Sequence, residues 1–401
     1  MKFAHLADVH LGGWREPKMR DVNTRSFITA IDRCLAEKVD FIILAGDLFN
    51  TSMPPIESLK VAVQKLKEAR DKGVPIYIIP GSHDFSPSGK TILDVLEEAG
   101  LFTNVAKGDI TEDGKLKLRF TVDTKTGVKL TGVLGKKGGL DRKYYEDIVR
   151  EPLESEPGPK IFLFHCALQE VKPKELAEMD AMSVAFLPKG FDYYAGGHVH
   201  VVDRANLGTH NNIVYPGPVF PNNFAEIEKL RHGSFVLYDN GVVTHVPLQL
   251  HPTISITVSA EGKTPSETEQ AVLEELKTKS LKDAIVTVRI AGTLKQGRPS
   301  DVNLNDLIQH CYDLGAYFVM KNSNALLSTE FEQVTLSTRS VDDIEDRLIA
   351  EHVGKSGVFP AEYERALLRD LMQSFAKEKD EGEKIADFEK RVKTDAQRIL
   401  S

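Results

Sequence analysis

Five short polar motifs carry aspartate and histidine side chains directly after apolar runs. In chain order they are Asp8-Val9-His10, Gly46-Asp47-Leu48-Phe49-Asn50, Gly81-Ser82-His83-Asp84, His165 alone, and Gly196-Gly197-His198-Val199-His200. Ligands of α/β sheets bind outside the carboxyl ends of the strands, so we expect the five motifs to converge on one edge although they are far apart in the chain.

Aspartate oxygens and histidine nitrogens together suit Mn²⁺, Fe²⁺ or Zn²⁺ better than a soft metal. Two such ions about 3.5–4 Å apart, sharing Asp47, would clamp the attacking and leaving oxygens of a phosphodiester. A single histidine at a strand end is more often a surface or core residue than a ligand. Five motifs at five strand ends instead indicate one joint site, and the sequence therefore predicts a two-metal phosphodiesterase.

The order of these motifs resembles that of the calcineurin-like metallophosphoesterase superfamily across residues 1–250. Weaker features over the whole chain resemble the SbcD-type DNA repair nucleases, also called meiotic recombination eleven nucleases. These features are Val214-Tyr215-Pro216-Gly217, the turn His232-Gly233-Ser234-Phe235, a small α/β unit and a charged helical tail. The resemblance implies a metal-dependent DNA nuclease, an exonuclease or endonuclease of double-strand-break repair.

The resemblance also assigns roles to individual residues. A first metal would be held by Asp8, His10, Asp47 and His200, and a second by Asp47, Ser82, His165 and His198. His83 would stay unligated beside the scissile phosphate, where it protonates the leaving group or stabilises the transition state. Asp84 would orient His83 rather than bind metal, and Asn50 would support the site from behind the ligands. The two metal ions are expected to be manganese, Mn²⁺.

Two positions depart from the family pattern. The family usually has asparagine where this chain has Ser82, and a serine hydroxyl is a shorter and weaker ligand than an amide carbonyl. The second metal is therefore expected to keep more water and to bind more loosely. Some relatives carry histidine where Asn50 stands, which removes one auxiliary group. Attenuated or metal-selective activity is the expected result.

The fold class predicted from these features is α/β: a two-sheet calcineurin-like metallophosphoesterase core with a small α/β capping domain and a helical C-terminal tail. Strands are expected at Lys2 to Leu6, Phe41 to Ala45, Ile76 to Ile79, Ile161 to Phe164 and Tyr193 to Ala195. Apolar residues at helical spacing predict crossover helices between the first three strands. A second sheet follows, with runs at Ile213 to Tyr215, Ser234 to Leu237 and Val242 to Val246.

We expect three domains: residues 1–250 as the nuclease domain, 251–330 as the capping domain and 331–401 as a helical tail. The middle unit alternates strands and helices, and Thr264, Pro265 and Glu267 mark a helix start with a capping box. The predicted features of the tail are a helix start at Ser340, one apolar stripe of Val341, Ile344 and Leu348, and another of Tyr363, Leu367 and Leu371. The tail has little core of its own, so it is expected to dock onto a partner. The resemblance identifies that partner as an SbcC-type ATPase.

Composition adds limits to this interpretation. The net charge of −8 gives no overall basic footprint, so DNA contacts must come from local cations. The candidates are Arg15, Lys18, Arg20, Arg25, Lys136 and Lys137. Three scattered cysteines indicate a reducing compartment. No apolar stretch long enough to span a membrane is present, and a cytoplasmic, nucleoid-associated protein is expected.

Alternatives stay open at this point. The same site would also serve a phosphodiesterase of small nucleotides, although that function leaves residues 251–401 unexplained. Ser82 would also suit a weakly active scaffold that binds DNA ends or the ATPase. The helices near Ser58 to Lys72 and Gly89 to Gly100 either pack only on the sheet or pair two copies into a homodimer. Cleavage polarity and the preference for ends or internal sites do not follow from the sequence.

Overall fold

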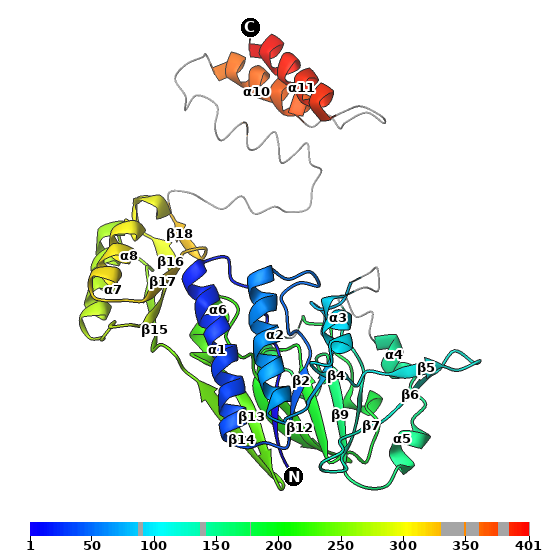
Figure 1. Cartoon of the computed structure of the whole chain (residues 1–401). Coiled ribbons are helices and arrows are strands. Elements are labelled where there is room, and N and C mark those ends of the chain that lie inside the picture. The colour runs from blue at the N-terminus through cyan, green and yellow to red at the C-terminus, as the bar shows by residue number, and fades with distance from the viewer. Residues whose placement is uncertain are drawn as a thin grey trace. The chain divides into compact units, whose positions relative to one another are not determined.

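The computed structural model describes residues 1–86, 91–136, 142–176, 178–329, 349, 361–375 and 385–400. The chain divides into two compact units, Met1–Glu330 and Phe331–Ser401, which are described separately (Figure 1). The first unit contains two six-stranded sheets and a smaller four-stranded sheet. The predicted α/β class with a helical tail is confirmed.

The first six-stranded sheet has the order β14-β13-β1-β2-β3-β4. Its strands are β1 (Lys2–Leu6), β2 (Phe41–Ala45), β3 (Ile76–Ile79), β4 (Thr103–Asn104), β13 (Gly233–Asp239) and β14 (Val242–Leu248). Strands β1 to β4 are parallel neighbours, and β13 pairs antiparallel with β1. Helices α1 (Pro17–Ala36) and α2 (Ile56–Asp71) are the predicted crossovers, and α3 (Ile92–Glu98) follows β3.

The second six-stranded sheet has the order β11-β12-β10-β9-β8-β7. Its strands are β7 (Thr121–Val122), β8 (Lys129–Gly132), β9 (Lys160–His165), β10 (Tyr193–Gly197), β11 (Val202–Leu207) and β12 (His210–Pro216). Strands β8, β9, β10 and β12 are parallel. A hairpin of β5 (Gly108–Ile110) and β6 (Leu116–Leu118) and the short helices α4 (Arg142–Glu146), α5 (Glu151–Ser155) and α6 (Phe224–Leu230) lie between or after these strands.

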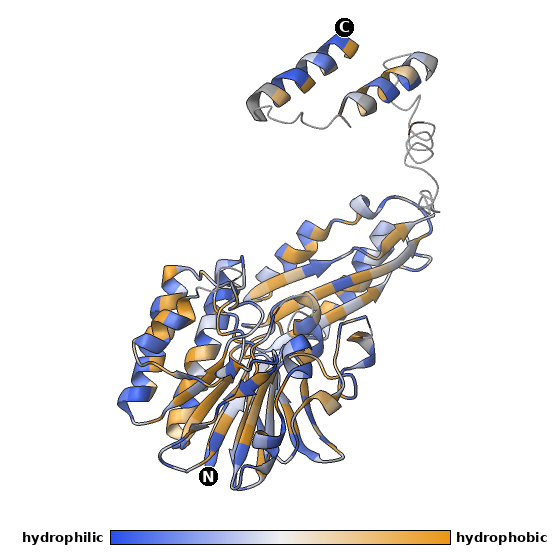
Figure 2. Ribbon diagram, turned by 90° about the vertical axis from the view of Figure 1, so that its right-hand side faces the viewer, coloured by the Kyte–Doolittle hydropathy of each residue, from blue (hydrophilic) through white to orange (hydrophobic). Residues whose placement is uncertain are grey.

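The two sheets pack face to face, and alternate residues of each strand point to opposite faces. Phe3, Ile43 and Ile79 of the first sheet meet Leu163 and Ala195 of the second in one buried cluster. On the other face of the first sheet, a separate cluster buries α1 and α2. The strands are accordingly hydrophobic along much of their length (Figure 2). This packing places the carboxyl ends of β1, β2, β3, β9 and β10 where the two sheets meet.

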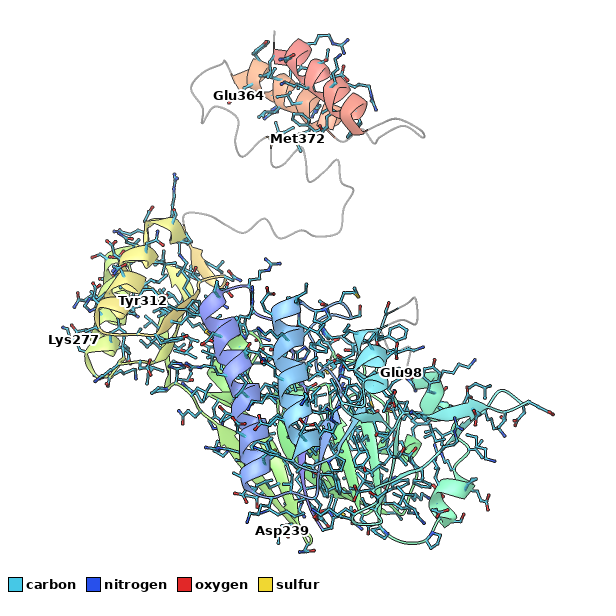
Figure 3. The ribbon with its side chains drawn as sticks, viewed as in Figure 1. Glu98, Asp239, Lys277, Tyr312, Glu364 and Met372 are labelled. Carbon is cyan, nitrogen blue, oxygen red and sulfur yellow. The ribbon has the colours of Figure 1, made fainter. Side chains whose placement is uncertain are left out.

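Residues 253–328 form a compact α/β unit with its own buried cluster. Its parallel strands are β15 (Thr253–Ser259), β16 (Ile285–Leu294), β17 (Phe318–Asn322) and β18 (Leu326–Ser328), with α7 (Pro265–Lys277) and α8 (Leu304–Asp313) between them. The predicted capping box at α7 is present. Lys277 and Tyr312 belong to this part (Figure 3). Whether it acts as a capping domain stays a prediction.

The second unit contains α10 (Ala361–Phe375) and α11 (Ile385–Leu400), which pack against each other. The predicted stripe of Tyr363, Leu367 and Leu371 lies on α10, where Glu364 and Met372 are also found (Figure 3). The helix start expected at Ser340, with Val341, Ile344 and Leu348, lies outside the described residues. Within the described parts of the chain, no helix combines the length and apolar character that crossing a bilayer requires.

Phe3 lies at the centre of the contact between the sheets and yields a stability prediction. Its ring stacks on Phe41 at 5.0 Å and on Tyr238 at 4.6 Å, and it meets Tyr193 edge-on at 5.1 Å. We expect Phe3→Ala to lower the free energy of unfolding by about 3–5 kcal/mol, because it leaves a cavity among rings that cannot collapse. Phe3→Leu should cost less. Urea unfolding measures both, and a Phe3→Ala midpoint equal to wild type would contradict this packing.

Candidate metal centre

The five polar motifs meet at one edge of the two-sheet core. Asp8 and His10 follow β1, Asp47 follows β2, and Ser82-His83-Asp84 follows β3. His165 ends β9, and His198 and His200 follow β10. The backbone approaches closely here: a Cβ on Gly46 would lie 2.1 Å from His165 Nδ1, and the φ of Gly46 is +89°. Glycine is therefore required at position 46.

Five candidate ligands have left-handed backbone conformations. Their φ angles are 51° at Asp8, 47° at His10, 54° at Asp47, 93° at His198 and 50° at His200. Such conformations cost about 1–3 kcal/mol each in non-glycine residues and collect at functional sites. Backbone hydrogen bonds hold them, since the Asp8 amide donates to Gly46 O at 3.1 Å and the His10 amide donates to Asp47 O at 2.9 Å. All five strained residues lie just after strands, and this concentration of strain indicates a functional site.

Asp8, His10 and His200 form one group whose ligand atoms lie within 4.8 Å of one another. His10 Nε2 lies 3.1 Å from His200 Nε2, and His200 Nε2 lies 3.8 Å from Asp8 Oδ1. Two imidazole nitrogens bound to one ion at about 2.1 Å would be separated by about 3.0–3.4 Å. This donor set fits a metal ion.

Asp8, Asp47 and His165 form a second group of the same kind. His165 Nδ1 donates to the carbonyl of Ala45 at 2.8 Å, which directs Nε2 toward the site. His165 Nε2 lies 3.1 Å from Asp47 Oδ2. Within the described part of the chain, this buried nitrogen has no well-directed hydrogen bond. A buried nitrogen held in this way, beside a carboxylate, fits a second metal ion.

His83 lies beside both groups, and His10, Asp47 and His83 make a third cluster. The His83 amide donates to Asp47 Oδ1 at 2.7 Å, and its Nδ1 donates to the carbonyl of Asn50 at 2.8 Å. Nε2 is left for another partner. The backbone oxygen of Asn50 thus orients the His83 ring, and a role for the Asn50 side chain stays a prediction.

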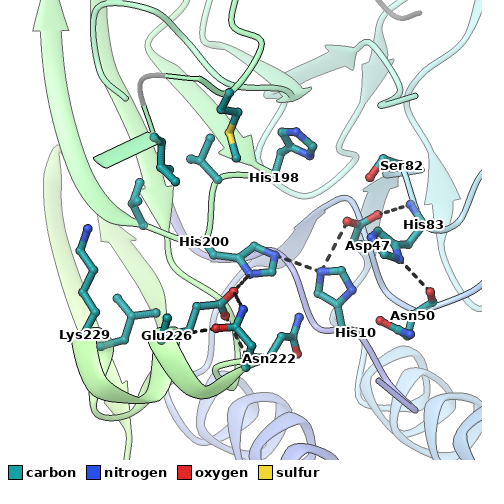
Figure 4. A pocket seen from close by; sticks show the side chains of 17 residues that line it. His10, Asp47, Asn50, Ser82, His83, His198, His200, Asn222, Glu226 and Lys229 are labelled. Carbon is teal, nitrogen blue, oxygen red and sulfur yellow. Dashed lines mark hydrogen bonds and ion pairs between the residues drawn. The ribbon is translucent and has the colours of Figure 1, made fainter. Parts of the chain in front are cut away.

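Ser82 and His198 belong to none of these three clusters among the described residues. Both line the same pocket, with Ser82 next to His83 and His198 across the pocket from it (Figure 4). The His198 amide donates to both oxygens of Asp8, at 2.9 and 3.1 Å. His198 therefore contributes to the site through its backbone as well as its ring.

The protonation of the site depends on its buried charges. Burial lowers the pKa of His165, but Asp47 and Asp8 outweigh it and raise that pKa to about 10. Burial likewise opposes the effect of Asp8 and Glu226 on His200, whose pKa is raised to about 9. Burial raises the pKa of Asp47, but His165 and His10 lower it by more, so the net effect is a lowered pKa. Both histidines are therefore protonated at neutral pH when no metal is bound.

Asp84 is bonded to backbone amides on two turns. Its buried carboxylate accepts hydrogen bonds from the amides of Leu48, Phe49 and Gly81, at 3.0 to 3.2 Å. Burial and the nearby Asp47 raise the pKa of Asp84 to about 7, against these backbone bonds. Asp84 thus ties the turn after β2 to the turn that carries His83, and its effect on the orientation of the His83 ring stays a prediction.

Glu226 is a site residue that the sequence reasoning missed. Its Oε1 lies 3.0 Å from Nδ1 of His200, in the arrangement by which carboxylates orient metal-binding histidines. The spacing of Asn223 and Glu226 signals a helix start, which the structure shows at α6. Nothing in that local pattern points to a histidine elsewhere in the chain.

The basic residues after the first motif mostly make contacts within the protein. Lys18 Nζ donates to the carbonyl of Tyr317 at 3.1 Å, and Arg25 Nη2 donates to His251 Nε2 at 2.8 Å. Arg20 donates to the carbonyls of Trp14 and Arg15. Arg15 itself is exposed. Lys18 thus contacts the 253–328 unit directly, and Arg25 contacts His251, whose ring stacks on Tyr317 of that unit. Contact of either residue with DNA stays a prediction.

Lys136 is also engaged within the protein. Its Nζ donates to Tyr144 Oη at 2.6 Å and lies over the rings of Phe85 and Tyr144. Lys137 lies outside the described residues. DNA binding by this pair stays a prediction, and for Lys136 it would require release of the Tyr144 contact.

The candidate ligands open into a pocket of about 560 Å³ (Figure 4). His83 and Asn50 lie at one side of it, His10 and His200 lie in the middle, and Glu226 and Lys229 lie at the other side. Leu176, Met179, Val199 and Val201 add apolar walls. The metal centre is therefore reachable by a ligand larger than a water molecule.

Comparison with known proteins agrees with this geometry. The model of the calcineurin-like phosphoesterase family matches residues 1–202. DNA double-strand break repair protein Mre11 of Archaeoglobus fulgidus is 28% identical over 238 residues, which is 57% of this chain and 52% of that protein. The Mre11 protein of Methanopyrus kandleri is 30% identical over 245 residues, 58% of this chain and 51% of that protein.

A longer match is found with the Mre11 protein of Sulfolobus acidocaldarius, at 24% identity over 366 residues, 86% of this chain and 89% of that protein. With the first two relatives, the chain spans about half of their length. These similarities confirm the resemblance to the SbcD-type, or Mre11, proteins that the motifs predicted.

Metal binding at this centre should release protons. His165 and His200, with pKa values of about 10 and 9, must lose their protons before their nitrogens can bind an ion. We therefore expect Mn²⁺ affinity to rise between pH 6.5 and 8.5. Calorimetry in two buffers of different ionisation enthalpy should show release of close to one proton per histidine at pH 7.

The metal-free protein should show the opposite trend. A histidine whose pKa is raised on folding stabilises the fold fully below its unfolded value, about 6.5, and loses that contribution as pH rises through 9 to 10. Thermal unfolding without metal should therefore become easier over the range in which metal affinity increases. Mn²⁺ affinity that is independent of pH between 6.5 and 8.5 would contradict the proposed ligands.

Proposed function

Because the chain belongs to the calcineurin-like phosphoesterase family, we propose that it is a metal-dependent nuclease that cleaves phosphodiester bonds of DNA during double-strand-break repair. The observation that carries the proposal is the convergence of aspartates and histidines from five strand ends, with residues of four of these ends lining one open pocket. The relatives' name, DNA double-strand break repair protein Mre11, supports DNA as the substrate.

Two divalent ions, manganese by preference, are proposed for the pocket. The first would be held by Asp8, His10, Asp47 and His200, and the second by Asp47, Ser82, His165 and His198. When bound, such ions supply Lewis acidity that activates water and offsets negative charge on a phosphate. The distances from Asp47 Oδ2 to His10 Nε2 and His165 Nε2, 3.5 and 3.1 Å, support an Asp47 shared by the two ions.

His83 is proposed to act on the leaving group. Its Nδ1 donates to the Asn50 carbonyl, which leaves Nε2 for the substrate, and Nε2 can donate to a phosphate oxygen when the ring carries a proton on both nitrogens. Water then forms the new bond to phosphorus while the bond to the departing sugar oxygen breaks. The proton on His83 Nε2 passes to that oxygen, and the attacking water supplies a proton in return.

Ser82 should make the second metal the weaker one. The residue is buried in the pocket wall, and its hydroxyl is a poor neutral ligand. His198 belongs to neither compact cluster, which supports the same order of affinity. Activity is therefore expected to keep rising with Mn²⁺ after the first site is filled.

The tail is proposed to bind an SbcC-type ATPase, and the protein is proposed to act in the cytoplasm at the nucleoid. Helices α10 and α11 are amphipathic, and Tyr363 and Phe375 expose large apolar surfaces. Exposed apolar residues on paired helices suit a helical partner. Whether two copies pair through α2 and α3 stays open, although Ile56 and Val95 are strongly exposed there.

A comparison of substrates tests the function. Cleavage of linear DNA in Mn²⁺, with little turnover of a small chromogenic phosphodiester, is the expected result. Efficient turnover of the small diester without DNA cleavage would favour a small-nucleotide phosphodiesterase. Absence of both activities, with binding of DNA ends or the ATPase retained, would favour a scaffold.

His83→Ala should reduce DNA cleavage by about 10²–10⁴-fold while leaving Mn²⁺ content unchanged, because the side chain is assigned to proton donation and not to ligation. His310→Ala is the control, since that histidine is exposed on α8 and remote in sequence from the motifs. The measurement is DNA cleavage together with metal content by atomic emission. Loss of metal in His83→Ala would make His83 a ligand instead.

Removal of residues 331–401 should abolish association with the ATPase and leave Mn²⁺ binding unchanged, because Met1–Glu330 forms a compact unit by itself. Co-purification of the ATPase with full-length and shortened chains measures the first effect, and calorimetry with Mn²⁺ measures the second. An ATPase that still co-purifies with the shortened chain would place the binding surface in the first unit.

A further inference from the structure

Helix α6 is seven residues long and has a different partner on each side. Toward the metal centre, Glu226 Oε1 lies 3.0 Å from His200 Nδ1. The same carboxylate accepts from the Asn222 amide at 2.8 Å and from Asn223 Nδ2 at 2.6 Å. Glu226 is therefore fixed by three hydrogen bonds and is only partly exposed.

The contact with Glu226 determines which nitrogen His200 presents to the pocket. A carboxylate accepts only, so His200 Nδ1 carries the proton of this bond. The opposite nitrogen, Nε2, then faces His10 Nε2 at 3.1 Å and Asp8 Oδ1 at 3.8 Å (Figure 4). Carboxylates in this position fix the orientation of a metal-binding imidazole and raise its basicity.

The other side of α6 is bound to the 253–328 unit. Glu228 pairs with Arg289 of β16 through two nitrogens, at 2.6 Å from Nη2 and 3.1 Å from Nε. The Arg289 guanidinium also lies 5.0 Å above the ring of Phe224. Directly after α6, Arg231 donates to Ser255 Oγ at 2.7 Å and its carbonyl accepts from Thr253.

Apolar packing connects the same parts. Ile227 of α6 is buried with Trp14, Phe220 and Ile285, and Ile285 begins β16. Trp14 Nε1 donates to the carbonyl of Pro221 at 3.0 Å, just before the helix. Because polar and apolar contacts both join α6 to the 253–328 unit, a displacement of that unit would displace Glu226.

We propose that Glu226 is a positioning residue for His200, and that the 253–328 unit holds Glu226 in place through the contact between Glu228 and Arg289. The proposal rests on the assignment of His200 to the first metal under the proposed function. Under this proposal, the affinity for the first metal depends on the Glu228–Arg289 ion pair, although neither residue contacts the metal. It also gives the 253–328 unit a role at the metal centre besides covering it.

The first test compares Glu226→Ala, Glu226→Gln and wild type. Mn²⁺ affinity is measured from the free-ion signal in electron paramagnetic resonance, and ligand geometry from the visible absorption of bound Co²⁺. We expect Glu226→Ala to weaken the tighter site about 10–100-fold and to change the Co²⁺ spectrum. Glu226→Gln keeps an acceptor oxygen for His200 and should recover part of the affinity.

The second test moves away from the centre. Arg289→Ala and Glu228→Gln should each weaken Mn²⁺ binding in the same direction but less than Glu226→Ala. The double variant should be no worse than the more affected single one, as expected for two partners of one contact. Lys295→Ala is the matched control, because it breaks an ion pair with Glu267 in the same unit, away from α6. It should bind Mn²⁺ as wild type does.

The outcomes separate the possibilities. Wild-type affinity and spectrum in Glu226→Ala would overturn the positioning role. If that variant does not fold, fully wild-type Mn²⁺ affinity in Glu226→Gln, which lacks the carboxylate charge, would do so. Unchanged binding in Arg289→Ala and Glu228→Gln would overturn the link to the 253–328 unit. A wild-type chain that binds neither Mn²⁺ nor Co²⁺ would instead overturn the metal site of the proposed function.

Discussion

Three buried carboxylates at the meeting edge of two sheets impose the main constraint on this fold. Asp8, Asp47 and Asp84 are each about 1% exposed, and charges removed from water must be compensated by partners. Backbone amides supply part of the compensation, since each of the three accepts at least one. Burial acts to raise the pKa of all three carboxylates. His165 lies beside Asp8 and Asp47 and opposes this effect at both, whereas Asp47 adds to it at Asp84, whose pKa is raised to about 7. Bound cations would add positive charge beside Asp8 and Asp47.

This constraint explains why so much backbone strain gathers here. The turns after β1, β2 and β10 must direct amides inward at carboxylates while turning side chains toward the pocket. Left-handed conformations satisfy both demands at once. The sheets supply the rigidity, because β1, β2 and β3 are held in register by parallel neighbours and packed on both faces. A site on flexible loops would not retain such conformations.

The sequence predicts the strands and the candidate ligands well, because both follow from local patterns. Strands β1, β2 and β3 begin and end at the predicted residues, and the rule for parallel strand ends places Asp8 and Asp47 together. His165 joins them from the other sheet, because the two sheets pack face to face. The runs Ser234 to Leu237 and Val242 to Val246, which we expected in the second sheet, instead extend the first sheet beyond β1 as β13 and β14.

The partners of the site residues depend on tertiary contacts that local patterns do not encode. The local pattern marks Glu226 only as a helix-start residue, although it contacts His200. The sequence predicts DNA contacts for Lys18 and Arg25, and only the folded structure shows their contacts with Tyr317 and His251.

The tight fit at Gly46 bears on how relatives of this chain are interpreted. A single methyl group there would overlap the His165 ring and break its bond to the Ala45 carbonyl. A homologue could therefore retain every aspartate and histidine of the five motifs and still lack a functional second site. Inventories of ligand residues overlook such losses, so inactive members of a family are better recognised by also checking the small residues that leave room for the ligands.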